Sequence, residues 1–155
     1  MNSQNKTTIT IANEQSFLSI DEDDLSRTVS YVLDRYNQKE ASVSLALVDS
    51  PCIRSLKKRY FNIDEVTDVI SFGLNETPSC HLECEVVVNA QLASELATEN
   101  SRDARAELSL YVVHGLLHQL GFDDATNLAA NDMHATEDQI LEELGFGRVY
   151  SGKGK

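Results

Sequence analysis

The chain has 155 residues, of which 41% are hydrophobic and 25% charged, as is ordinary for a single soluble globular domain. No apolar run approaches the roughly 20 residues that cross a bilayer, and the polar start has no signal segment, so we expect a cytoplasmic protein without a membrane partner. The net charge of −12 argues against broad nonspecific nucleic-acid binding, because phosphate affinity comes from Lys and Arg, but leaves RNA binding open.

In chain order, the first half predicts a strand, a helix, a strand, a helix and a strand, over Thr7–Ile11, 19–37, Ser42–Val48, 51–60 and Thr67–Phe72. After a loop at Asn75–Ser79, the second half predicts one strand and three helices, over Glu85–Val88, 90–99, 104–120 and 131–144. This order predicts an α+β fold in which one small mixed four-stranded sheet packs with about five helices.

We expect residues 1–147 to form a single domain and residues 148–155 to form a flexible basic tail. The helix predicted over 104–120 is apolar on nearly all sides, which indicates a helix inside the core. Histidines in such a helix need partners for their ring nitrogens, because an unpaired buried polar group costs about 1–3 kcal/mol.

His114 and His118 lie four residues apart, and therefore on one face of this helix. Gly121 can end the helix and let the chain fold back, which would bring Asp123 or Asp124 to the same face. Two imidazoles and one carboxylate leave the fourth position of a zinc ion open for water, as in catalytic sites. The alternative is a pair of ordinary histidines bonded to backbone carbonyls.

Cysteine usage and basic residues suggest two further, weaker sites. Cys80, His81 and Cys84 could form a second metal cluster, although the odd total of three cysteines favours reduced thiols. Four of the thirteen basic residues fall between positions 54 and 59, including Lys58 and Arg59. They could bind phosphates or simply form the solvated face of a helix.

Two motifs resemble those of the YbeY family of metal-dependent endoribonucleases. Thr67-Asp-Val-Ile-Ser-Phe72 is similar to the family's strand motif, and His114-Gly-Leu-Leu-His118 with the following Leu120–Asp123 is similar to its helix motif. Met133 and Glu137 fall where the family has a Met-x-x-x-Glu helix. The resemblance implies a zincin-like metal helix and a zinc-dependent, single-strand-type endoribonuclease that acts on RNA rather than DNA. It also implies roles in ribosomal RNA maturation and ribosome quality control, with ribosomal proteins or a ribosome-associated GTPase as partners.

The chain departs from the family pattern at two positions. Asp124 stands where the family usually has a third histidine, so the expected Zn²⁺ ligands are His114, His118 and Asp124, with His134 as the fallback. The extra negative charge should make a bound water less acidic. Phe61 stands where the family commonly has an arginine; Lys58 and Arg59 are therefore the residues we expect to hold substrate phosphates.

Two rival functions follow from the same residues. A zinc peptidase would need a glutamate after the first histidine, but Gly115 is there, so that function lacks its general base. Gly115 itself could serve close helix packing or leave room for a phosphodiester. The other rival is a non-catalytic ribosome-assembly factor with a weakened metal site.

No residue stands out in the sequence as the catalytic base. Glu107 and Asp123 are candidates, although either could instead support the histidines. Asp68 is expected to anchor a turn or an ion pair.

Overall fold

The computed structural model describes residues 6–75 and 81–147 of the chain. Within these residues four strands form one sheet: β1 (Lys6–Asn13), β2 (Glu40–Val48), β3 (Val69–Gly73) and β4 (Leu82–Asn89). The helices are α1 (Glu22–Arg35), α2 (Ser50–Phe61), α3 (Ala90–Glu99), α4 (Ala104–Gln119) and α5 (Asn127–Glu143). The predicted α+β fold, with a small mixed sheet and five helices in the described part of the chain, is confirmed.

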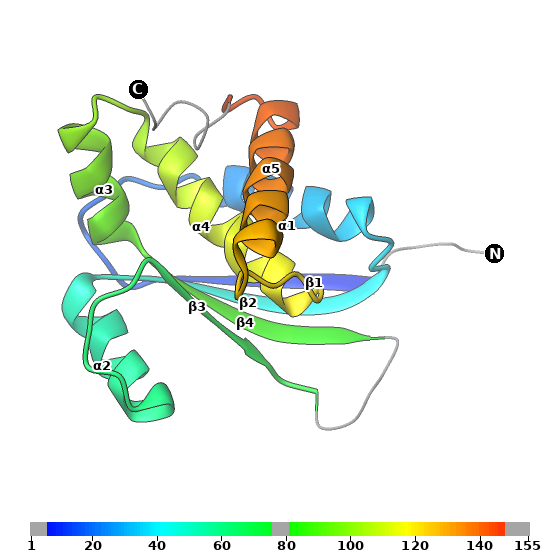
Figure 1. Cartoon of the computed structure of the whole chain (residues 1–155), viewed down its shortest axis with the longest axis horizontal. Helices are drawn as coiled ribbons and strands as arrows, with labels where there is room; N and C mark the ends of the chain where they lie inside the picture. The colour runs from blue at the N-terminus through cyan, green and yellow to red at the C-terminus, as the bar shows by residue number, and fades with distance from the viewer. Residues whose placement is uncertain (1–5, 76–80, 148–155) are drawn as a thin grey trace.

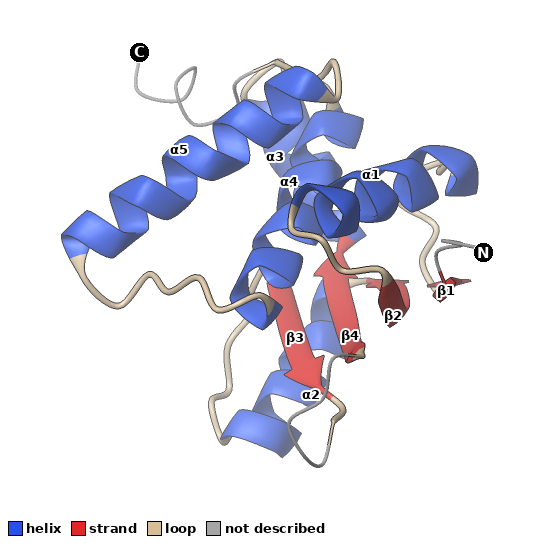
Figure 2. Cartoon of the chain, turned by 90° about the vertical axis from the view of Figure 1, so that its right-hand side faces the viewer, coloured by secondary structure: helices blue, strands red, loops and turns tan. Residues whose placement is uncertain are grey.

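The sheet has the strand order β1-β2-β4-β3, and its pairs are parallel except for the antiparallel pair β3–β4. Strand β3 is therefore an edge strand. Helix α2 covers one face of the sheet, whereas α1, α4 and α5 lie on the other, as Figures 1 and 2 both show. Two sheet faces covered by helices explain why the central strands β2 and β4 are rich in buried aliphatic residues.

The alternation of side chains along β4 divides the core into two unequal clusters. Cys84, Val86 and Val88 belong to the large cluster between the sheet and the helices α1, α4 and α5. Val87, on the opposite face, belongs to a small cluster with Ile53 of α2. Most of the apolar burial therefore lies on the α4 side of the sheet.

Helix α4 runs through this large cluster, and its buried residues include Ala106–Val113 and Gly115–Leu117. The prediction of a helix buried on nearly all sides is confirmed. Gly115 faces the sheet: a Cβ atom there would lie 2.8 Å from Cγ1 of Val86 and 3.1 Å from Cγ2 of Val69. Close helix–sheet packing, rather than room for a substrate, therefore accounts for this glycine.

We expect Gly115→Ala to lower the free energy of unfolding by up to about 2 kcal/mol, because overpacking a core costs about 1–3 kcal/mol and helix propensity returns only about 1 kcal/mol. Urea denaturation followed by circular dichroism measures this change. In a double-mutant cycle, Val86→Ala should cost less in the Gly115→Ala background than in the wild type, because it removes the methyl that the new Cβ meets. Equal costs would contradict the packing explanation.

Several predicted boundaries were wrong by a few residues. Helix α5 begins at Asn127 rather than at 131, because the Thr126 hydroxyl accepts a hydrogen bond from the backbone N–H of Ala129 and caps an earlier turn. Leu128 is 75% exposed and breaks the apolar stripe that the prediction followed. Helix α1 begins at Glu22 rather than at 19, because the Asp21 carboxylate accepts hydrogen bonds from two backbone N–H groups and caps the helix there.

Some expectations fall on residues outside the described ranges. They are the basic tail at 148–155 and most of the loop predicted at Asn75–Ser79. Among the residues that the structure describes, no helix is both long and apolar enough to span a membrane.

Candidate metal centre

The C-terminal end of α4 and the turn after it bring three potential metal ligands together. Gly121 adopts a φ of +102°, which glycine tolerates without steric cost, and the chain reverses after it. Asp124 Oδ2 then lies 3.8 Å from Nε2 of His114 and 3.6 Å from Nε2 of His118. The two Nε2 atoms are 3.1 Å apart. The predicted trio therefore converges.

The hydrogen-bond partner of each Nδ1 atom determines whether the Nε2 atom of the same imidazole carries a proton. His118 Nδ1 lies 3.2 Å from the backbone carbonyl of Phe122, which can only accept, so Nδ1 carries the proton. His114 Nδ1 lies 2.5 Å from Glu137 Oε2, a carboxylate that accepts in the same way. In the neutral tautomers both Nε2 atoms are therefore unprotonated, and three lone-pair-bearing atoms face one another, which is unfavourable unless a cation lies between them.

The donor set fits a zinc ion. Ligand atoms about 2.0–2.2 Å from a tetrahedral ion lie about 3.3–3.6 Å from one another. The three separations in this group, 3.1, 3.6 and 3.8 Å, lie around that range. Among the described residues, these three form the one group of His, Cys, Asp or Glu side chains whose ligand atoms converge closely enough for a metal ion.

Glu137 forms a hydrogen bond with Nδ1 of His114, on the side of the ring away from the other ligand atoms. The sequence alone did not identify Glu137 as a site residue. It is fully buried on α5, and its Oε1 atom has no hydrogen-bond partner among the described residues, so His114 is what compensates this carboxylate. The sequence signal was a charged residue within the apolar stripe of α5, between Met133 and Ile140. A carboxylate behind a ligating histidine fixes its orientation and raises its basicity.

The charges around His114 favour positive charge at this position. Burial lowers the pKa of the His114 imidazole, whereas its hydrogen bond with Glu137 and that carboxylate's charge raise it. The charges of Asp68 and Asp124 add to the increase, and the net pKa lies above its ordinary value. The carboxylates around His114 therefore stabilise a positive charge at this position, whether a proton on the imidazole or a cation bound to it.

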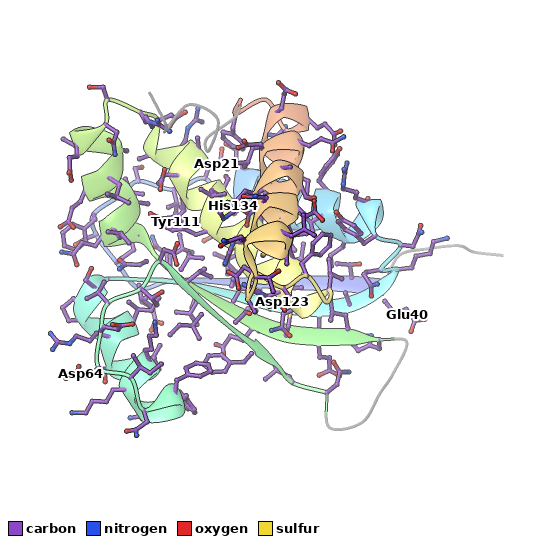
Figure 3. The ribbon with its side chains drawn as sticks, in the orientation of Figure 1. Asp21, Glu40, Asp64, Tyr111, Asp123 and His134 are labelled. Carbon is purple, nitrogen blue, oxygen red and sulfur yellow. The ribbon has the colours of Figure 1, made fainter. Side chains whose placement is uncertain are left out.

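The alternative third ligands lie elsewhere. The Asp123 carboxylate accepts a hydrogen bond from the backbone N–H of Ala125 at 3.0 Å, as a residue that shapes the turn. His134 lies on α5, and Figure 3 shows it well away from Asp123. Neither residue is part of the converging group.

Glu107, a candidate for the catalytic base, is buried and accepts a hydrogen bond from the Tyr111 hydroxyl at 3.1 Å. Asp68 lies at the start of β3, where its backbone carbonyl accepts from Asn89. The negative charge of Asp68 nevertheless raises the pKa of His114. Asp68 therefore acts on the metal centre, in addition to the role in a turn or an ion pair that we expected.

The basic cluster is on the other face of the sheet from the centre. Lys58 and Arg59 are exposed residues of α2, which Figures 1 and 2 show across the sheet from α4. Arg54 pairs with Asp64 at 2.7 Å and Lys57 with Glu65 at 3.5 Å. The structure therefore does not group Lys58 and Arg59 with the metal ligands, and their binding of substrate stays a prediction.

The second candidate cluster, at Cys80, His81 and Cys84, is only partly described. Cys80 lies outside the described ranges, and Cys84 is fully buried in the large core cluster. Burial raises the pKa of the Cys84 thiol to about 11. A neutral thiol enclosed by aliphatic side chains is a core residue rather than a ligand.

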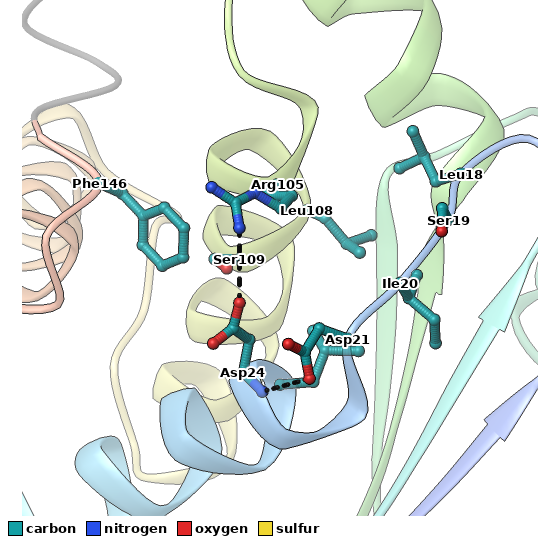
Figure 4. Close-up of a pocket in the computed structure, with 10 residues that line it drawn as sticks. Leu18, Ser19, Ile20, Asp21, Asp24, Arg105, Leu108, Ser109 and Phe146 are labelled. Carbon is teal, nitrogen blue, oxygen red and sulfur yellow. Dashed lines mark hydrogen bonds and ion pairs between the residues drawn. The ribbon is translucent and has the colours of Figure 1, made fainter.

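A hollow near the other end of α4 is separate from the centre. Figure 4 shows it between the segment before α1, the first turns of α1 and α4, and Phe146. Arg105 reaches Asp24 across it at 3.6 Å. These contacts join α1 to α4, and no residue of the metal centre lines this hollow.

Comparison with known proteins adds to this geometry. The family model described as Endoribonuclease YbeY matches residues 10–145. Curated proteins named Endoribonuclease YbeY are similar: that of Nitratiruptor sp. is 35% identical over 138 residues (89% of this chain, 90% of that protein), and that of Salinibacter ruber 33% over 143 residues (88% and 91%). A solution structure from Thermotoga maritima shares the fold, with a TM-score of 0.61 and 23% identity over 88% of this chain and 89% of that one. The chain therefore belongs to the Endoribonuclease YbeY family.

Proposed function

We propose that the protein is a zinc-dependent endoribonuclease that cuts RNA at the centre formed by His114, His118 and Asp124. The observation that carries the proposal is the convergence of His114 Nε2, His118 Nε2 and a carboxylate oxygen of Asp124, while the Nδ1 atom of each histidine has its own acceptor. Membership of the Endoribonuclease YbeY family supports RNA as the substrate.

Each residue of the centre would have a distinct role. His114 and His118 would hold the ion through Nε2, while Glu137 and the Phe122 carbonyl keep the protons on Nδ1. When bound, zinc lowers the pKa of a water molecule and polarises a phosphoryl oxygen. Asp124 contributes a negative charge where a third histidine would be neutral, which reduces both effects.

The biological setting is part of the same proposal. We infer a role in ribosomal RNA maturation and ribosome quality control in the cytoplasm, with ribosomal proteins or a ribosome-associated GTPase directing the enzyme to its substrate. A targeting partner suits a chain whose net charge of −12 gives it little general affinity for RNA.

The test is cleavage of structured ribosomal RNA by purified protein. We expect cleavage that disappears with a chelator, returns with zinc, and is absent in His114→Ala even with zinc added. Cleavage by His114→Ala would point to a contaminating nuclease and contradict the proposal. RNA binding without cleavage under any metal would favour the ribosome-assembly factor, and chelator-sensitive hydrolysis of an unstructured protein would favour the peptidase.

A further inference from the structure

An aromatic cluster lies on the sheet face opposite the metal centre, where the end of α2 meets β3. Phe61 stacks on Phe72 with ring centroids 5.7 Å apart and an interplanar angle of 17°. Tyr60 meets Phe72 edge-on at 5.2 Å. Tyr60 is 58% and Phe61 47% exposed. We call Tyr60, Phe61 and Phe72 the aromatic platform, and its rings are both ordered against one another and open to solvent.

Exposed apolar side chains gather around this platform. Of the seven large hydrophobic residues that are exposed in the described part of the chain, Tyr60 and Phe61 belong to it, and Leu74 lines the same groove as Tyr60 and Phe72. Single exposed apolar residues are common, but a contiguous patch indicates a binding surface. Nothing in the metal chemistry proposed above uses this patch.

The charge beside the platform favours an anionic ligand. The Arg59 guanidinium lies 6.0 Å from the centroid of the Tyr60 ring. Among the described residues no salt bridge involves Arg59, in contrast to Arg54 and Lys57, which are paired. A cation next to stacked aromatic rings is the combination that binds single-stranded nucleic acids, the cation through phosphates and the rings through base faces.

The groove next to these rings also offers a polar group for a base edge. It is lined by Leu56, Tyr60, Phe72, Gly73, Leu74, Glu85 and Val87. Glu85 is directly opposite Phe72 in the β3–β4 pair. A carboxylate there accepts hydrogen bonds from base amino groups and repels phosphate, so it favours a base over a phosphate in the groove.

Strand β3 connects the platform to the metal centre. Ile70 and Phe72 pack on the α2 side of the sheet. Ser71 points to the other side, where its Oγ accepts a hydrogen bond from Gln119 Nε2 at 3.0 Å, in the last turn of α4. Because β3 is an edge strand, a ligand that passes around it crosses only the thickness of the sheet between the two faces. That thickness is small, since packed layers are about 10 Å apart.

We propose that the aromatic platform binds an unpaired base of single-stranded RNA by stacking, with Arg59 on the adjoining phosphate, and that the RNA strand passes around β3 toward the metal centre. The proposal rests on the proposed function for its ligand. A duplex does not satisfy the platform, because its bases are already stacked on one another.

The experiment measures RNA binding without cleavage. Fluorescence anisotropy of a labelled, unstructured RNA oligonucleotide is recorded in chelator at low salt for the wild type, Phe61→Leu and Phe61→Trp. Phe17→Leu is the matched control, because Phe17 is 48% exposed in the segment before α1. The chain has no tryptophan, so Phe61→Trp also introduces a single indole whose fluorescence reports stacking.

We expect Phe61→Leu to weaken binding about tenfold, while Phe17→Leu and Phe61→Trp keep the wild-type affinity and RNA quenches the new indole. An abasic ribose-phosphate oligomer should bind weakly and equally to the wild type and Phe61→Leu. Unchanged affinity in Phe61→Leu, no quenching, or no binding by the wild type would overturn the platform. Platform-dependent binding without zinc-dependent cleavage would instead overturn the nuclease function alone, and zinc-dependent cleavage with unchanged affinity in Phe61→Leu would overturn the platform alone.

Discussion

Replacing Asp124 with alanine is expected to reduce the zinc content of the purified protein from about one ion per chain to nearly none, since a catalytic zinc site needs three protein ligands. His114→Ala and His118→Ala should have the same effect, because the three ligand atoms converge on one point. Elemental analysis after reconstitution with zinc and desalting measures the ratio directly.

Asp123→Ala is the matched control for Asp124→Ala. Asp123 is the adjacent carboxylate, but it bonds the backbone of its own turn and lies outside the converging group. We expect this variant to keep its zinc. Retention of zinc in Asp124→Ala, with loss in Asp123→Ala or in His134→Ala, would move the third ligand to that residue.

Asp124→His tests how the negative charge of Asp124 affects the acidity of a water molecule bound to the ion. This variant should keep the ion, because histidine is an accepted ligand. Removal of one negative charge beside the ion makes bound water more acidic, so the pH at which RNA cleavage reaches half its maximum should fall. A rise, or no change, would contradict the role given to the Asp124 charge.

Glu137→Gln is expected to raise the dissociation constant for zinc by about 10–100-fold, as is typical when the partner of a ligating histidine is changed. The carboxylate is fully buried, and its hydrogen bond with Nδ1 of His114 sets which nitrogen faces the metal. Glutamine keeps the shape of the side chain but removes its charge. Competition with a zinc-binding dye gives the constant, and circular dichroism checks that the helices are retained.

Asp132→Asn is the control for this second prediction. It removes the same charge from the same helix, but Asp132 is exposed and its backbone carbonyl, rather than its carboxylate, accepts the hydrogen bond from Thr136. Its zinc affinity should equal that of the wild type. If Glu137→Gln matched it, Glu137 would be only a packing residue of the core.

In the function proposed above, the metal centre and the aromatic platform together let an acidic chain bind RNA. The centre has a negative surrounding that favours a cation, which would in turn attract phosphate. The platform lies on the opposite face and combines exposed rings with Arg59, a cation outside any salt bridge of the described residues. Phe61 is the ring that stacks on Phe72.

Local patterns in the sequence determined the elements of the fold and the chemical type of the site. Alternation and β-branched residues predicted the strands, and apolar residues on all sides predicted the burial of α4. The four-residue spacing put His114 and His118 on one face, because that spacing is close to one helical turn. Boundaries were less well predicted, since the caps of α1 and α5 depend on which side chain reaches a backbone N–H.

Only the tertiary structure decided which distant residues meet. Helical spacing could not choose between Asp123, Asp124 and His134, because the choice depends on the path of the turn after Gly121. Glu137 is 23 positions from His114 and reaches it only because α5 packs on α4. Likewise, the strand order makes β3 an edge and puts Phe72 beside Phe61, since the pairing of strands is a long-range property that no local pattern contains.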